Sequence, residues 1–200
     1  MKNIFLAGLA IGFLVIGTTE RVHAVSVSDM QLNGQNADAY ALGPDNNDQA
    51  GEINDLGGLF TGNEFSFIAQ DGGTPSGSLG GITFSLTAYS VGQTSGTWDL
   101  TWSGSGFPVT VDIVGVLKAS DTYYAFLFDN EILSAPGTNN PNDSWIITFL
   151  NNGGQIPDLS HMSLYARDVT PNTTVPEPAT MLLFGAGLAG LAGIARRKMQ

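Results

Sequence analysis

Apolar and polar side chains alternate along several short stretches in the middle of the chain. In residues 81–90, apolar side chains occupy every second position, namely Ile82, Phe84, Leu86 and Ala88. A period of two places them on one face of a β-strand, with threonine and serine on the other face. Similar patterns, bounded by Gly, Asn, Pro or Ser, cover residues 64–69, 97–103, 107–118, 122–130, 144–150 and 162–167. Together they predict an all-β fold, a single jelly-roll-like β-sandwich over residues 25–170.

Three segments depart from this alternation. In residues 107–118 the apolar phase shifts near Gly115, which predicts a bulge or bend in the strand. Residues 122–130 are apolar on both faces and predict a central strand that is buried on both sides. Residues 33–63 are rich in Asn, Asp and Gly, and predict a long loop region with a short helix or an edge strand within it.

Residues 1–24 have the layout of a secretory signal peptide. Lys2 provides a short positive region, and residues 4–17 form an apolar run interrupted only by small residues. A small residue, Ala24, comes directly before Val25, which predicts cleavage between these two residues. The alternative is a retained N-terminal membrane anchor, but a run of about 14 apolar residues is short for a membrane span.

The C-terminal end combines a stiff segment, an uncharged segment and a basic end. Residues 171–178 form a Pro-rich stalk, in which two prolines around one glutamate favour an extended backbone. Residues 179–195 carry no charge, and as a helix they reach roughly 26 Å, the lower limit for crossing a bilayer core. Because this segment has no polar face, we expect a transmembrane helix rather than a buried core helix. Residues 196–200, which begin with three basic side chains, are then expected to form a basic cytoplasmic tail.

The order of these C-terminal parts resembles the PEP-CTERM sorting signal of Gram-negative bacteria. The resembling stretch, VPEPATMLLFGAGLAGLAGIARRK, places a Pro-Glu-Pro motif before a hydrophobic helix and a basic end. The residues of the sorting signal are Pro176, Glu177, Pro178, Arg196, Arg197 and Lys198. The resemblance implies that an exosortase, a membrane-embedded enzyme, recognises and processes the chain near the Pro-Glu-Pro motif. Signal peptidase and the secretion machinery are the other partners that an exported chain requires.

The same resemblance implies a location and a role. The protein would be exported, transiently anchored in the inner membrane, and then moved to the cell surface or extracellular matrix. Such proteins commonly accompany exopolysaccharide and biofilm systems, so the implied role is that of a structural, non-enzymatic surface or matrix protein. The middle of the chain resembles, more weakly, extracellular domains found ahead of such signals, on the stretches SGTWDLTW, VLKASDTYYAFLF and LSHMSLYAR. That weaker resemblance brings no catalytic residues.

Charge and cysteine content exclude several functions for the region between the two ends. Residues 25–175 contain 16 acidic residues and two basic ones, Lys118 and Arg167, a formal net charge of −14. Nucleic-acid phosphates require cationic partners, so we expect no nucleic-acid partner. The chain has no cysteine, which excludes thiolate catalysis, iron–sulfur clusters and Cys-based zinc sites. We expect no cofactor, and side-chain packing must stabilise the exported domain without disulfides.

His161 is the single histidine that remains after cleavage at residue 24. A catalytic triad would need a nucleophile and an acid within its reach. Its neighbour Ser160 points to the opposite face of the predicted strand. We therefore expect a structural histidine that bonds a backbone group, and no enzymatic activity.

Four carboxylates in the loop region offer a possible Ca²⁺ site, since hard oxygen ligands suit this ion. They are Asp45, Asp48, Glu52 and Asp55. An EF-hand loop requires glycine at its sixth position and glutamate at its twelfth, where this chain has Ala50 and Leu56. A solvated acidic loop without a metal ion is the expectation, and a non-standard Ca²⁺ site is the alternative.

Aromatic residues support the second candidate function, a carbohydrate-binding module for exopolysaccharide. Trp98, Trp102 and Trp145, together with Tyr123 and Tyr124, could form a platform on which a sugar ring stacks. In each predicted strand, however, they stand at the spacing of core residues. We therefore expect them in the core, with sugar contact by the three tryptophans as the alternative.

Overall fold

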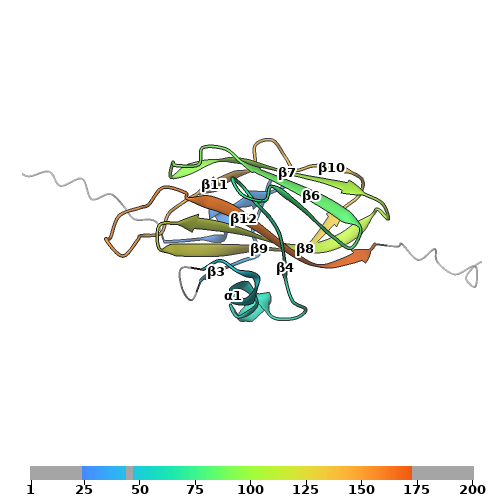
Figure 1. Cartoon of the computed structure of the whole chain (residues 1–200), viewed down its shortest axis with the longest axis horizontal. Helices are drawn as coiled ribbons and strands as arrows, with labels where there is room; N and C mark the ends of the chain where they lie inside the picture. The colour runs from blue at the N-terminus through green and yellow to red at the C-terminus, as the bar shows by residue number, and fades with distance from the viewer. Residues whose placement is uncertain (1–23, 44–46, 173–200) are drawn as a thin grey trace, which may run out of the picture.

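The computed structural model describes residues 24–43 and 47–172, and β-strands dominate this part of the chain (Figure 1). The strands are β1 (Gln31–Leu32), β2 (Gln35–Asn36), β3 (Ala39–Leu42), β4 (Ser66–Gln70), β5 (Ser76–Leu79), β6 (Ile82–Ala88), β7 (Ser95–Gly104), β8 (Val109–Ala119), β9 (Thr122–Leu133), β10 (Gly137–Thr138), β11 (Ser144–Ile146) and β12 (His161–Pro171). One short helix, α1 (Ala50–Asn54), and two 3-10 turns, Val27–Asp29 and Gly58–Phe60, complete the described elements. The all-β prediction is confirmed.

Residues 1–23 of the predicted signal peptide lie outside the described residues, as do the predicted transmembrane helix and basic tail. Within residues 24–43 and 47–172, no helix is long and apolar enough to cross a membrane.

Two five-stranded antiparallel sheets form most of the fold. The first, here called the β9 sheet, has the order β3-β9-β8-β12-β4. The second, the β7 sheet, has the order β10-β7-β6-β5, and β11 also pairs with β7. The short strands β1 and β2 pair with each other. Many neighbours in the sheets are also neighbours along the chain, as in β5–β6–β7 and β8–β9. The finer jelly-roll-like arrangement stays a prediction.

The facing sides of the two sheets share one buried cluster. The β7 sheet contributes Phe84, Leu86, Trp98 and Leu100, and the β9 sheet contributes Ile113, Leu117, Phe126, Phe128, Met162 and Leu164. A second cluster lies on the other side of the β9 sheet, where Ile53, Phe60 and Phe65 pack against Val114, Val116, Leu127 and Tyr165. In Figure 1, α1 accordingly lies on the side of the β9 sheet away from the β7 sheet. The β9 sheet is therefore buried on both faces.

This double cover explains where the alternating pattern holds and where it fails. In β6, alternate side chains are buried as predicted. The central position of β9, between β3 and β8, is also confirmed.

The predicted bulge near Gly115 is misplaced: the register shifts between Val111 and Ile113, and Gly115 pairs regularly with Phe126. The apolar phase is lost at Gly115 because both faces of β8 are covered there. A Cβ at Gly115 would lie 2.3 Å from the Met30 methyl carbon, so a larger residue there would require the end of the Met30 side chain to move.

The region 33–63 contains both of the elements that its sequence allowed. β3 is an edge strand of the β9 sheet, and α1 is the short helix. The strands β1, β5 and β10 have no clear pattern in the sequence. Each is short or is built from small and polar residues, so its pairing depends on its neighbours rather than on its own propensity.

Arg167 fastens the outer cover to the β9 sheet. Its Nε donates to Oδ2 of Asp112 at 2.8 Å, and its Nη1 donates to the carbonyl oxygens of Phe60 at 2.9 Å and Thr61 at 3.0 Å. The guanidinium carbon lies 4.2 Å from the centre of the Phe65 ring. Arg167 is buried, and so is Asp112. Arg167 also donates to the carbonyl oxygens of Asn63 at 3.3 Å and Leu59 at 3.2 Å, so one cation holds a carboxylate, four carbonyl groups and an aromatic ring around it.

We expect Arg167→Met to lower the free energy of unfolding by about 3–5 kcal/mol, because it leaves the Asp112 carboxylate buried without its cation. Urea unfolding of the full chain measures this loss. The double variant Arg167→Met/Asp112→Leu should be more stable than Arg167→Met alone, since it removes the unpaired charge. A loss below about 0.5 kcal/mol for the single variant would contradict the assigned role.

Candidate functional site

The sequence-predicted site residues fall into three groups. The sorting residues Pro176, Glu177, Pro178, Arg196, Arg197 and Lys198 lie outside the described residues, as does Asp45 of the acidic loop. At the predicted cleavage bond, Ala24 is exposed and Val25 is partly buried against the core. The remaining candidates, the tryptophans, the other loop carboxylates and His161, are described.

The three tryptophans belong to the core, and their burial argues against the alternative that they contact a sugar. Trp98 and Trp145 are at most 1% exposed, and Trp102 is 8% exposed. Each indole Nε1 donates to a backbone carbonyl oxygen inside the protein, those of Gln31, Ala135 and Thr97 for Trp98, Trp102 and Trp145, respectively. Their faces are therefore covered by protein and cannot stack on a ligand.

Three of the four carboxylates of the acidic loop, Asp48, Glu52 and Asp55, are described. Among residues 24–43 and 47–172, no three His, Asp or Glu side chains lie close enough to hold a metal ion. Glu52 lies within α1 and Asp55 forms its C-terminal cap, whereas Asp48 precedes the helix and faces β12. Asp48 therefore separates from the other two carboxylates and joins a different cluster.

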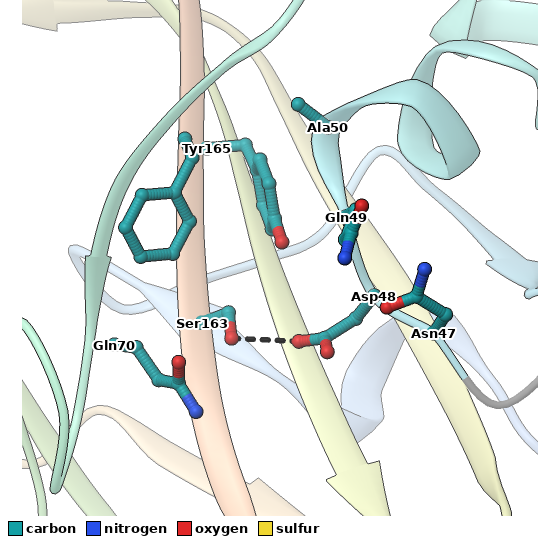
Figure 2. Close-up of a pocket in the computed structure, with 8 residues that line it drawn as sticks. Asn47, Asp48, Gln49, Ala50, Gln70, Ser163 and Tyr165 are labelled. Atoms are coloured by element: carbon teal, nitrogen blue, oxygen red, sulfur yellow. Dashed lines mark hydrogen bonds between the residues drawn. The ribbon is translucent and has the colours of Figure 1, made fainter.

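Asp48 lines a recess between the segment before α1 and strands β4 and β12 (Figure 2). The recess, here called the Asp48 recess, has a volume of about 350 Å³. Its lining residues are Asn47, Asp48, Gln49, Ala50, Phe67, Gln70, Ser163 and Tyr165. Polar side chains thus predominate on its walls, and one aromatic ring, that of Phe67, is 43% exposed.

Two residues of β12 bind the Asp48 carboxylate. The Ser163 hydroxyl donates to Oδ2 of Asp48 at 2.7 Å, and Nε2 of His161 lies 3.2 Å from the same oxygen. His161 and Ser163 are two positions apart on one strand, so both side chains reach the same face. The expected backbone partner of His161 is therefore corrected: the partner in this structure is the Asp48 side chain.

The order of these three groups differs from that of a catalytic triad. In a triad the histidine stands between the serine and the carboxylate, and accepts the serine proton. Here Asp48 stands between Ser163 and His161, and Ser163 is only 1% exposed. The arrangement fixes an anionic acceptor at the edge of a recess and does not activate a nucleophile.

The electrostatics favour an ionised Asp48. Burial raises the pKa of Asp48, but the hydrogen bonds from His161 and Ser163 and the attraction of His161 outweigh it, and the pKa lies below its ordinary value. Lys118 lies nearby, and burial lowers its pKa although Asp48 and Asp121 oppose this shift. Burial also raises the pKa of Tyr165. The recess thus holds one carboxylate and a neutral phenol at neutral pH.

A second surface recess, here called the Tyr40 recess, lies near the predicted mature N-terminus and measures about 530 Å³. Its lining residues are Ala24, Val25, Tyr40, Leu42, Thr122, Tyr124, Thr148, Phe149, Leu150 and Asn152. The ring centres of Tyr40 and Tyr124 lie 6.3 Å apart, and those of Tyr124 and Phe149 lie 4.9 Å apart. Two of its polar side chains already have partners, since Thr148 donates to Asp29 and Asn152 donates to Asp121.

Sequence reasoning missed both recesses because their walls come from distant segments. Asp48 and Ser163 are 115 positions apart. One signal was present: the spacing of His161 and Ser163 places two polar side chains on the strand face opposite Met162 and Leu164. On a strand that is buried on both sides, such a polar pair requires a polar partner.

We expect Asp48→Asn to lower the free energy of unfolding by about 1–3 kcal/mol at neutral pH, because it weakens two hydrogen bonds to a charged group. A carboxyl group with a lowered pKa stabilises the fold above its unfolded pKa, and this contribution is lost as the pH falls through the folded value. The difference between wild type and variant should therefore shrink below pH 3.8, the ordinary pKa. Urea unfolding across the acid range, with Asp158→Asn at an exposed position as control, checks this. A difference that is constant with pH would contradict it.

Comparison with known proteins bears on the C-terminal end of the chain. Residues 174–198 match the family model described as PEP-CTERM protein-sorting motif. No curated protein and no solved structure matches the chain. The match lies beyond the described β-strands, so it identifies the sorting tail and leaves the domain to be interpreted from its own residues. The chain therefore carries at its C-terminal end the PEP-CTERM protein-sorting motif that its C-terminal features predicted.

Proposed function

We propose that this protein is an exported structural component of the cell surface or extracellular matrix, associated with biofilm or exopolysaccharide, and that an exosortase sorts and processes its tail. The observation that carries this proposal is the match of residues 174–198 to the sorting motif, which implies export and membrane-associated sorting. In this proposal the signal peptide at residues 1–24 directs export. The uncharged segment 179–195 then anchors the chain transiently in the inner membrane.

The described domain supports a structural role. Its two five-stranded sheets and the buried hydrophobic cluster between them are consistent with a β-sandwich. In this proposal the Pro-rich stalk connects that domain to the sorting tail. Its fold needs no disulfide, and the excess of acidic residues keeps separate copies soluble. The order of Ser163, Asp48 and His161 supports a non-catalytic role. The chemistry in this proposal is performed on the protein, by its processing enzymes.

The substitution Glu177→Ala, made in the native host, tests the proposed processing of the tail by an exosortase. Glu177 is the one carboxylate between the two prolines of the motif, so its loss should prevent recognition by the exosortase. We expect intact-mass analysis of wild-type protein from the cell surface to show that both ends are missing. The variant should remain in the membrane at a higher mass.

Glu64→Ala removes a carboxylate from an exposed position of the domain and is the matched control. It should be processed like the wild type. If wild type and Glu177→Ala both retain residues 179–200, the tail is a permanent anchor and processing by an exosortase is excluded.

The second candidate function is binding of exopolysaccharide carbohydrate. The specific observation in its favour is that the described surface has two recesses with partly exposed aromatic rings, those of Phe67 and Tyr40. Full-length protein in detergent should then bind the host's own polysaccharide in a saturable manner, while an unrelated polymer such as dextran serves as control. Absence of saturable binding would exclude this function and leave the structural role in place.

A further inference from the structure

We propose that the Asp48 recess binds an uncharged saccharide residue, whose ring lies on Phe67 and whose hydroxyl groups bond Asp48, Gln49 and Gln70. This inference rests on carbohydrate binding, the second candidate function, and adds to it a site and a ligand class. It does not depend on the tryptophans, which the core conceals.

The first support is the state of the polar side chains. Among the residues drawn in Figure 2, the hydrogen bond joins Ser163 to Asp48, and none joins the amides of Gln49 and Gln70 to a neighbour in the recess. Each of these amides offers both a donor and an acceptor, and the Asp48 carboxylate accepts further bonds. A ring with several hydroxyl groups matches this mixture, because each hydroxyl also donates and accepts.

The second support is the shape of the recess. Its volume of about 350 Å³ is close to the lower limit of small-molecule sites and fits one or two sugar rings. Phe67 is 43% exposed. The centre of its ring lies 5.6 Å from that of the buried Tyr165, and the two rings form a T-shaped pair. A fixed and partly exposed aromatic ring provides apolar surface for the carbon–hydrogen face of a sugar.

Charge disfavours an anionic ligand, which would meet Asp48 in a domain that is already strongly acidic. A cationic amine would have to compete for the Asp48 carboxylate with its present partners, Ser163 and His161. A hydroxyl group can bond the remaining lone pairs of this carboxylate without displacing either partner.

The Tyr40 recess is the competing location. The side chains of Thr148 and Asn152 already donate to Asp29 and Asp121. A sugar there would gain ring contacts and hydroxyl bonds from Tyr40 and Tyr124, whereas the Asp48 recess offers a carboxylate and two side-chain amides. Specific recognition therefore favours the Asp48 recess.

The experiment is calorimetric titration of the full chain in detergent with short neutral oligosaccharides of glucose, mannose, galactose or N-acetylglucosamine. Glucosamine and glucuronic acid serve as the cationic and anionic arms. We expect at least one neutral sugar to bind and the charged sugars to bind more weakly. Gln49→Ala and Gln70→Ala should each raise Kd about 5-fold, and Asp48→Asn about 10-fold or more.

Tyr40→Ala is the matched control and should leave Kd unchanged. The glutamine variants remove no hydrogen bond within the recess, so a lost fold does not explain their effect; unfolding midpoints equal to the wild type confirm this. If Tyr40→Ala abolishes binding and the recess variants do not, carbohydrate binding stands and the assigned site is wrong. If the host polysaccharide binds but none of the neutral sugars does, the ligand class is wrong. If nothing binds, both the site and carbohydrate binding are excluded.

Discussion

The buried ion pair between Arg167 and Asp112 is the constraint on which the outer half of the structure depends. Arg167 bonds the carbonyl groups of the segment that carries Phe60, and its guanidinium lies on Phe65. These two phenylalanines cover the β9 sheet on the side away from the shared core. On its second oxygen, Asp112 accepts the backbone N–H of Asn130 at 2.9 Å, where β8 and β9 shift register. One pair thus joins the bulge, the strand β12 and the cover, and removal of either partner would strand a charge in the interior.

A second buried carboxylate also holds distant segments together, in a chain that has no disulfide. Asp143 is 1% exposed and accepts the backbone N–H groups of Asn33 at 2.6 Å and Gly34 at 2.7 Å. It also accepts the Asn139 amide at 2.9 Å, and so holds the turn between β1 and β2 to the loop before β11. Some acidic residues that the sequence presents as surface charge are therefore internal loop anchors. Their hydrogen bonds offset the cost of burial, as a charged group inside a protein requires.

The sequence predicted the features that depend on the environment of a single strand. It did not predict the recess, which is formed where distant segments meet. The alternation in residues 81–90 and the doubly apolar run 122–130 predicted β6 and β9, because each pattern reflects the local environment of one strand. The phase shift at Gly115 was detected but misinterpreted, since a second cover and a bulge disturb an alternating pattern in the same way. The tryptophans were correctly expected in the core from their spacing. The Asp48 recess could not be predicted, because nothing near Asp48 in the sequence indicates Ser163 or Phe67 as its neighbours.

One face of strand β12 carries residues of both the Asp48 recess and the outer cover of the β9 sheet. Alternate residues of this strand, His161, Ser163, Tyr165 and Arg167, lie on the outer side, with the first three around the Asp48 recess and Arg167 at the cover. The strand then ends at Pro171, opposite Val109, whereas His161 pairs with Lys118 at the far end of β8. A strand of this length separates the two ends by roughly 30 Å. Ser163 and His161 therefore bind Asp48 near the end of the strand that is opposite Pro171. The ladders to β8 and β4 hold β12 on both of its sides, so the strand that carries the recess is an interior strand of the sheet.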